Sequence, residues 1–276
     1  FVKNEILKKL LFIFLFLISS LLISQNLKKE LFVKYTENEI NVDGILDEDD
    51  WSLASAATNF YESFPNHGEV SKNQAIIKVM NDDNHLYVGI KVFVKSEDLK
   101  SNTLRRDFQA QDSDNITMIF DTFNDGNTAF VIGSNHLGIQ RDMLLFNGGN
   151  GFRDWDMTWD IKWFSESKIH ENFYVTEWKI PLSSFKYREG ETKWRVNSYM
   201  RNTKSNSWIT WNLAPENLLF FNLAFTGDMY FEKPLGKSKS KKSFIPYINS
   251  IACNDFENEN KGDDFEFGGE AKFILD

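Results

Sequence analysis

Short runs of alternating apolar and polar residues, separated by clusters of Asn, Asp and Gly, constrain the fold more than any other feature of the sequence. Two such runs, Gln74–Met80 and His85–Val94, flank the segment Asn81–Asn84. Asn and Asp favour turns because they tolerate left-handed backbone conformations and bond their own backbone. From Leu86 onward, every second residue of the later run is aliphatic. The pattern therefore predicts a β-hairpin.

The same pattern continues along most of the chain. It predicts further strands over residues 115–120, 128–132, 139–146, 159–164, 173–180, 193–200 and 208–211. Helix is expected only within Glu48–Ala57 and in a weak turn at Leu182–Phe185. Many short strands with turn signals between them are typical of an all-β fold, an antiparallel sandwich or barrel.

The first 24 residues are typical of a secretory signal peptide. Lys3, Lys8 and Lys9 precede an apolar run, Leu10–Ile23, and the small residue Ser24 follows it. The run is shorter than the roughly 20 residues that span a bilayer. We therefore expect a cleaved signal peptide over residues 1–24, with an uncleaved membrane anchor as the alternative.

Composition narrows the expected location and partners. The net charge is -9, and no basic block balances it, which argues against nucleic acid as a partner. The single cysteine, Cys253, excludes an internal disulfide. An acidic, cysteine-poor and exported chain fits the envelope of a Gram-negative bacterium, in the periplasm, the outer membrane or at the cell surface.

A domain boundary is expected after residue 232. Lys233–Gly236 contains a Pro and a Gly and opens a linker, residues 233–243, that becomes rich in Lys and Ser. Two further strands are predicted beyond it, Phe244–Cys253 and Phe265–Leu275. Two strands do not form a stable domain. We therefore interpret residues 30–232 as one domain and residues 244–276 as the start of a second β domain in a longer protein.

Four segments, in this order, resemble the family 9 carbohydrate-binding modules. They are Ile40–Glu48 followed by Trp51, Asn84–Ile90, Asp114–Phe123 and Glu177–Phe185. The resemblance covers residues 38–230 and implies an antiparallel β-sandwich. It also implies non-catalytic carbohydrate binding in the cell envelope, as part of a carbohydrate-degrading system.

Other motifs resemble one subset of such proteins, an envelope group of Bacteroidetes type. The motifs are Arg105–Asp107, Asn135–Asp142 and Asp154–Asp156 followed by Trp159. In that group the family 9-like domain precedes an uncharacterised outer-membrane β-barrel. The resemblance implies that residues 244–276 are the first barrel strands and that the protein reaches the outer membrane through a later part. An accessory or plug domain that binds no sugar is therefore an alternative function.

The resemblance extends less fully to the sugar site. Sugar-binding members of the family hold a sugar between two tryptophans and use a Glu and an Arg nearby. In this sequence Gln111 stands where one tryptophan is expected, Thr117 replaces the Glu and Val131 replaces the Arg.

Sugar binding needs exposed aromatic faces and fixed polar groups. We expect Trp155 in an accessible loop, Trp159 and Trp163 in the core, and one of Trp208 and Trp211 facing outward because their positions differ in parity. Two Arg–Asp dipeptides favour an ion-pair network beside a cleft over a ligand clamp. The predicted ligand-binding residues are Trp155, Asp156, Arg106, Asp112, Arg141, Asp142 and Trp208.

Catalysis and metal binding receive little support. The carboxylate pairs Asp112 with Asp114 and Asp154 with Asp156 have a spacing that glycoside hydrolysis could use, but no pattern marks either pair as buried. We expect a non-catalytic chain. The alternative is that this chain is the appendage of an O-glycosyl hydrolase whose catalytic region is absent from the sequence. The acidic segment Asp43–Asp50 is dense enough in carboxylates to suggest a calcium site, but its spacing is not that of an EF-hand. No cofactor is expected, and calcium stays open.

Overall fold

The computed structural model describes residues 28–237, 243–254 and 261–272. The expected signal peptide and the middle of the expected linker lie outside these residues. Strands dominate the described chain, and its one α-helix, α2 (Asp49–Leu53), is short. The described chain also contains short 3-10 turns: η1 (Ser96–Asp98), η2 (Ala110–Asp112), η3 (Asn147–Gly149), η4 (Leu182–Ser184) and η5 (Leu223–Phe225).

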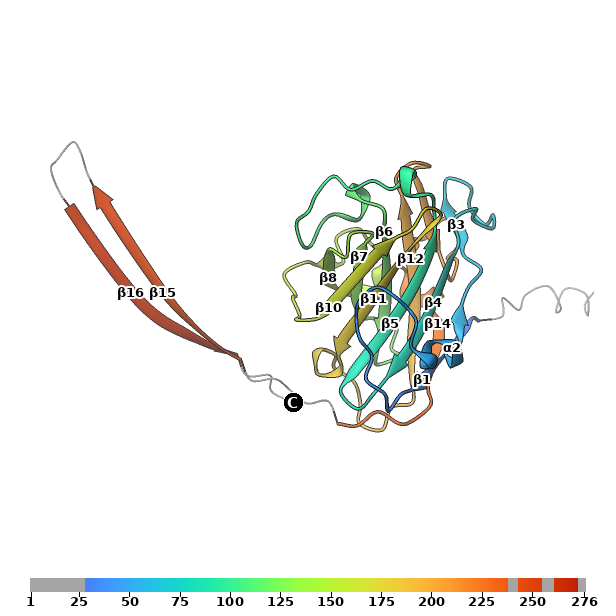
Figure 1. Cartoon of the computed structure of the whole chain (residues 1–276), viewed down its shortest axis with the longest axis horizontal. Coiled ribbons are helices and arrows are strands. Elements are labelled where there is room, and N and C mark those ends of the chain that lie inside the picture. Colours follow the sequence, from blue (N-terminus) through green and yellow to red (C-terminus); the bar gives the residue numbers. More distant parts are fainter. Residues whose placement is uncertain (1–27, 238–242, 255–260, 273–276) are drawn as a thin grey trace, which may run out of the picture.

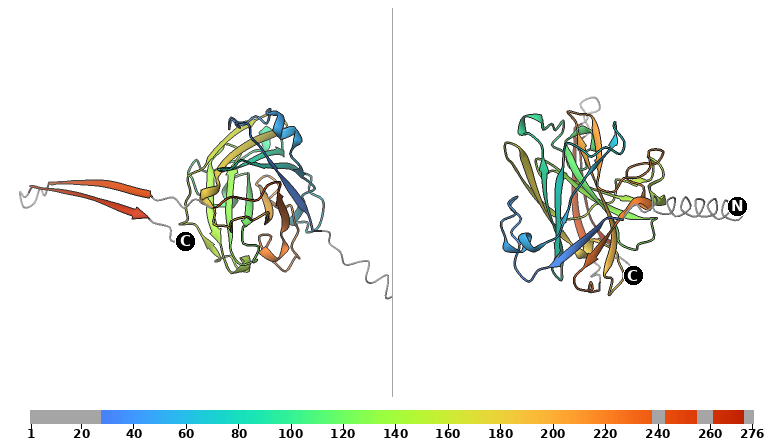
Figure 2. Two further views of the ribbon diagram at one scale, coloured as in Figure 1. Left: turned by 90° about the horizontal axis from the view of Figure 1, so that it is seen from below. Right: turned by 90° about the vertical axis from the view of Figure 1, so that its right-hand side faces the viewer.

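Two large sheets form a β-sandwich, as the sequence predicts (Figures 1 and 2). We call the first the β6 sheet; its order is β1 (Glu30–Tyr35), β14 (Gly227–Phe231), β12 (Lys193–Asn202), β6 (Asn115–Asp121), β7 (Ala129–Asn135), β8 (Gln140–Leu145) and β9 (Trp155–Asp156). At its side β13 (Ser207–Thr210) pairs with β12, and β3 (Tyr61–Phe64) pairs with β13.

We call the second the β5 sheet; its order is β10 (Phe164–Ile169), β11 (Phe173–Pro181), β5 (His85–Phe93) and β4 (Ala75–Asn81), with β2 (Ala56–Ala57) beside β4. The predicted hairpin is confirmed, because β4 and β5 pair in antiparallel register. The exception to the antiparallel pattern is β1, which joins the sheets by pairing in parallel with β14 and then with β4.

The main core lies between the two sheets. On β6, Ile116, Met118 and Phe120 point into it, and their alternating neighbours point to the other side of the sheet. Val88 and Ile90 of β5 face them from the second sheet, and each is fully buried. The alternation in the sequence therefore corresponds to an inner and an outer face on each sheet.

The predicted strand at residues 159–164 is wrong. The chain is irregular up to Trp163, and β10 begins at Phe164. Side chains satisfy the backbone here in place of a neighbouring strand. Asp142 accepts a hydrogen bond from the Ile161 amide at 2.8 Å, and Arg106 donates to the Ile161 carbonyl at 2.7 Å.

The two C-terminal strands form a separate two-stranded sheet. β15 (Ser243–Asn254) pairs along its whole length with β16 (Lys261–Lys272), and Figure 1 shows them as a long hairpin. Strands are therefore present at both predicted positions, although β16 begins earlier than expected. That these strands open a barrel stays a prediction.

Candidate functional site: an aromatic groove

The outer face of the β6 sheet carries an open groove of about 640 Å³. Its floor is formed by outward-facing residues of β8 and β12, and its walls by loops that follow η1, β8 and β13. We call it the aromatic groove; it is lined by Ser63, Phe64, Gln109–Gln111, Arg141, Met143, Phe152, Trp155, Met157, Tyr199, Trp208, Glu216 and Leu218–Phe221.

A row of aromatic rings crosses the groove. Trp155 belongs to β9 and Trp208 to β13, which stand on opposite sides of the sheet. Phe221 and Phe220 link them: the successive ring centroids lie 4.5, 5.0 and 4.8 Å apart from Trp155 to Trp208. Tyr199 adds a fifth ring, with its centroid 5.0 Å from that of Phe220. The rings thus form a connected row in which Trp155, Phe220 and Trp208 are partly exposed, whereas Phe221 and Tyr199 are buried at 2% exposure each.

The two tryptophans differ in how far their faces are covered. The Trp208 ring has Phe220 stacked on it at an interplanar angle of 20°, and the guanidinium carbon of Arg201 lies 5.0 Å from its centre. Trp155 meets Phe221 edge to face, at 61°. Trp155 is half-buried. It is therefore the better candidate for stacking on a ligand.

Arg141 is the buried cation of the groove. Its side chain comes from β8, and only 4% of the residue is exposed. Its Nη1 donates to the Tyr199 hydroxyl at 3.2 Å, and the sulfur of Met143 lies 3.8 Å from its Nη2. The Phe108 ring centre lies 5.5 Å from the guanidinium carbon. These contacts hold the guanidinium in place beneath the aromatic row.

The structure brings together three of the seven predicted site residues. Trp155, Arg141 and Trp208 all line the aromatic groove. Of the two candidate tryptophans near residue 210, Trp211 is buried at 3% exposure and Trp208 faces outward, as their parity predicts.

Two other predicted residues lie beside the groove without lining it. Asp156 follows Trp155 on β9, and its Oδ1 accepts hydrogen bonds from the amide and hydroxyl of Thr158. These bonds hold the pKa of the Asp156 carboxyl below its usual value. Asp112 ends η2, directly after Gln111, which does line the groove.

The remaining two, Arg106 and Asp142, form an ion pair away from the groove. Asp142 follows Arg141 on β8 and therefore points to the inner side of the sheet, where it accepts a hydrogen bond from Trp163 Nε1 at 3.2 Å. Arg106 also pairs with Asp160 at 2.8 Å. Burial raises the pKa of Asp142, while its hydrogen bonds and Arg106 act in the opposite direction. Arg106, Asp107 and Asp142 thus form a structural network of the kind that the two Arg–Asp dipeptides favoured, whereas Arg141 lies apart from it in the groove.

Sequence reasoning missed the middle of the aromatic row. Phe220 and Phe221 follow two leucines in a segment that matches no strand period, and Phe152 lies in a Gly-rich loop. An apolar run outside the predicted strands was the available signal. Its position over the β6 sheet depends on the tertiary fold, which the local pattern does not encode.

Asp114 and Asp154, one member of each carboxylate pair, bind backbone amides. Asp114 is buried and accepts hydrogen bonds from the backbone amides of Lys100 and Thr203. Asp154 accepts one from the Gly151 amide at 2.7 Å. Among the described residues, no group of three or more His, Cys, Asp or Glu side chains is arranged to hold a metal ion.

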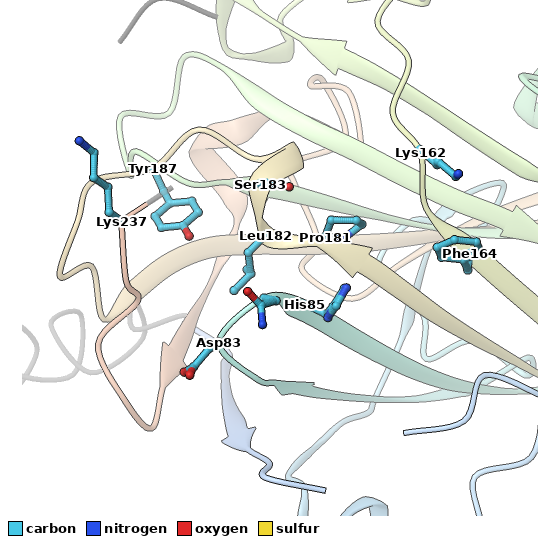
Figure 3. A pocket seen from close by; sticks show the side chains of 10 residues that line it. Asp83, His85, Lys162, Phe164, Pro181, Leu182, Ser183, Tyr187 and Lys237 are labelled. Atoms are coloured by element: carbon cyan, nitrogen blue, oxygen red, sulfur yellow. The ribbon is translucent and has the colours of Figure 1, made fainter. Parts of the chain in front are cut away.

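A second cavity, of about 510 Å³, lies at the end of the β4–β5 hairpin (Figure 3). Figure 3 shows Lys162 and Phe164 on one side of it and Tyr187 and Lys237 on the other. Burial raises the pKa of Tyr187. The cavity lacks a row of aromatic rings and a buried charged side chain, so the aromatic groove is the stronger candidate site.

Comparisons with known proteins support the fold. No protein-family model matches the chain, and no curated protein matches it. Solved structures do: a family 9 carbohydrate-binding module of Caldicellulosiruptor kristjanssonii, in complex with cellotriose, has a TM-score of 0.54 and 19% identity, covering 76% of this chain and 95% of that one. A family 9 module of the same organism, in complex with glucose, matches with a TM-score of 0.50 and 18% identity. This match covers 77% of this chain and 99% of that one.

A third structure comes from Bacteroides uniformis and is described as a candidate carbohydrate-binding protein. Its TM-score is 0.58 at 14% identity, and the match covers 74% of this chain and all of that one, 100%. The chain therefore has the fold of the family 9 modules. In the part of the chain that the structure describes, no helix has the length and apolarity needed to cross a membrane.

Proposed function

We propose that this chain is a non-catalytic carbohydrate-binding protein and that the aromatic groove holds the saccharide. The observation that carries the proposal is the row of rings ending in the half-buried Trp155, above the buried guanidinium of Arg141. Aromatic faces stack on the C–H faces of sugar rings, and fixed donors and acceptors bind the hydroxyls. The solved structures of the same fold with cellotriose and with glucose support the proposal.

Each part of the groove has a role in this proposal. Trp155 stacks on one sugar ring, and the exposed Phe152 extends the apolar wall toward solvent. Gln109 and Gln111 also line the groove and supply side-chain amides, each of which can both donate to and accept from a hydroxyl. Gln111 replaces an expected aromatic ring, so the rings of this groove come from other segments.

We also propose that the protein is exported to the cell envelope of a Gram-negative bacterium and acts within a carbohydrate-degrading system. The signal-peptide pattern of residues 1–24, the net charge of -9 and the single cysteine support this location. Fractionation of cells that produce the protein, followed by N-terminal sequencing of the mature form, tests it. Recovery from the cytoplasm with residues 1–24 intact would contradict it.

A second candidate function is an accessory domain of an outer-membrane β-barrel. The β15–β16 hairpin favours it because its apolar side chains are exposed: 74% for Ile248, 66% for Phe265 and 80% for Phe267. Extraction of the protein from the outer-membrane fraction only by detergent would support this role. Its recovery as a freely soluble periplasmic protein would contradict it.

The sugar-binding proposal is tested by titrating the chain with a panel of oligosaccharides, followed by tryptophan fluorescence and calorimetry. Trp155→Ala should weaken binding about tenfold or more, because stacking on an aromatic ring contributes on the order of 1–2 kcal/mol. Phe164→Ala, in the second cavity, is the matched control and should bind normally. No binding by the folded chain, or binding that Trp155→Ala leaves unchanged, would contradict the proposal.

A further inference from the structure

We infer that the aromatic groove selects a sugar that carries a negative charge, a carboxylate or a sulfate ester, and that Arg141 binds this group. The inference rests on the proposed function and names the class of saccharide. The observation behind it is that Arg141 lines the groove as a buried cation without a carboxylate partner.

The partners of Arg141 are few and uncharged. Its Nη1 reaches the hydroxyl of Tyr199 and its Nη2 reaches only the sulfur of Met143, a weak acceptor. Its Nε is buried and has no hydrogen-bond partner. No Asp or Glu among the described residues forms a salt bridge with it. A guanidinium has five N–H donors, so most of the donors of Arg141 remain for a ligand.

Two other arginines of the sandwich, Arg195 and Arg106, are each paired with an acid. Arg195, on the same face of the β6 sheet, lies 3.8 Å from Asp121 and donates to Thr226 and to the Leu223 carbonyl. Arg106 pairs with Asp142. Arg141 is more buried than either of these arginines, and yet it lacks an acid.

A charge that is removed from water without a counter-charge is costly, and the ring of Phe108 offsets only part of that cost. An anionic ligand group would supply the missing partner. Carboxylates and sulfates fit the planar fork of a guanidinium with two parallel hydrogen bonds, which a neutral hydroxyl does not do. The groove is therefore better matched to an acidic sugar than to a neutral one.

The surroundings reinforce this selection. The one acid that lines the groove is Glu216, which is exposed at the rim and remains hydrated. Arg201 stacks on Trp208 but does not line the groove, and it donates to the Ser207 carbonyl and the Asn206 side chain. Arg141 is therefore the cation of the groove, within a protein whose net charge is -9.

The net negative charge limits the ligand further. A protein of this charge repels a long polyanion at a distance, so attraction must come from short-range contacts in the groove. We expect one acidic residue of a short oligosaccharide to be bound at Arg141, with its neighbours stacked along the aromatic row.

The test compares each acidic oligosaccharide with a neutral form of the same sugar. The probes are trigalacturonate and its methyl ester, trimannuronate and its methyl ester, a xylo-oligosaccharide bearing glucuronate and its methyl ester, and a galacto-oligosaccharide with and without sulfate. Calorimetry on the wild-type chain should show at least one acidic probe binding about tenfold or more tightly than its neutral form. The arm that shows this preference identifies carboxylate or sulfate as the anion.

Two variants at Arg141 assign the preference to this residue. Arg141→Met keeps an unbranched side chain of similar length and removes the charge, so the preference for the acidic probe over its neutral form should disappear. Arg141→Lys keeps the charge and loses the fork, so part of the preference should remain. Far-UV circular dichroism establishes that each variant is folded, and the wild-type comparison stands even where a variant fails to fold.

The outcomes separate this inference from the proposed function. Equal affinity for the acidic and neutral forms, with binding that still depends on Trp155, overturns the inference and leaves sugar binding intact. A preference for the acidic form that folded Arg141→Met retains also overturns it. No binding of any probe by the folded chain overturns both.

Discussion

The two sheets of this sandwich differ most on their outer faces. The outer face of the β5 sheet is covered by the chain itself: Ile40, Trp51 and Ala54 pack on Met80 and Tyr87, and all five are buried. The outer face of the β6 sheet is left open as the aromatic groove, where Phe152 is 75% exposed. The chain therefore uses aromatic residues to cover the outer face of the β5 sheet and to line an open groove on the outer face of the β6 sheet.

The covered face depends on a fitted contact between three residues. Gly89 of β5 lies opposite Glu177 of β11, and Trp51 lies over both. A Cβ atom at Gly89 would stand 3.0 Å from the Trp51 ring, so only glycine leaves space for it. Glu177 accepts hydrogen bonds from Trp51 Nε1 and from the amides of Asp43 and Gly44. The buried carboxyl of Glu177 therefore finds its hydrogen-bond donors within the chain. The buried guanidinium of Arg141, in contrast, has no Asp or Glu partner among the described residues.

The largest expected effect follows from removing the cover. Trp51→Ala should lower the free energy of unfolding by about 3–5 kcal/mol, because it leaves a cavity and removes one donor from the buried Glu177. Urea denaturation followed by circular dichroism measures this loss. Sugar binding below the unfolding transition should stay unchanged, since the groove lies on the other sheet. A loss of binding in the folded variant would show that the two faces are coupled.

The second effect is a pH dependence of the covered face. Burial, with the nearby Glu48, raises the pKa of Glu177 from 4.5 to about 7. Between these values the folded chain holds a proton that the unfolded chain has released, so stability falls as pH rises through this range. The contribution of Glu177 to the free energy of unfolding should fall by about 2–3 kcal/mol between pH 4.5 and pH 8.

Glu177→Gln isolates this contribution. The variant cannot ionise at this position, so its stability should fall less than that of the wild-type chain over the same pH range, while other titrating groups cancel in the comparison. Urea midpoints at pH 4.5, 6 and 8 for both proteins measure the difference. Parallel pH profiles for wild type and Glu177→Gln would show that Glu177 has an ordinary pKa.

The sequence predicts the sandwich better than it predicts the groove. Strands with strict alternation, such as β4, β5 and β6, are found where the pattern places them, because burial of one face selects the period. Helical turns are found within both stretches expected to contain them, as α2 and η4, although α2 ends at Leu53 and Ala56–Ala57 form β2; the other 3-10 turns were not predicted. These elements are decided by local turn chemistry and by the period of apolar residues.

Failures occur where distant side chains replace the local pattern. Residues 159–163 alternate like a strand, but Asp142 and Arg106 bind their backbone and hold them in an irregular path. The parallel pairing of β1 with β14 joins residues nearly 200 positions apart in the sequence, such as Glu30 with Asp228, and β1 also pairs in parallel with β4. The groove likewise unites Trp155 with Phe220 and Phe221, which only the folded chain brings together.

The smallest expected effect on stability is at the rim of the open face. Phe152→Ala removes a ring that is 75% exposed and touches Phe221 edge to face, with centroids 6.0 Å apart. Its free energy of unfolding should change by less than about 0.5 kcal/mol, the range of most surface substitutions. Saccharide affinity should fall about threefold to tenfold if the ring extends the stacking surface beyond Trp155.

Phe164→Ala is the matched control for this rim, since Phe164 is 51% exposed and lines the second cavity. Both variants should unfold at similar urea concentrations, and calorimetry should find reduced sugar affinity only for Phe152→Ala. Equal affinities would confine binding to the inner rings of the groove. A large loss of stability in Phe152→Ala would mean that its ring serves as a cover, as Trp51 does, and would remove the distinction between the closed and the open face.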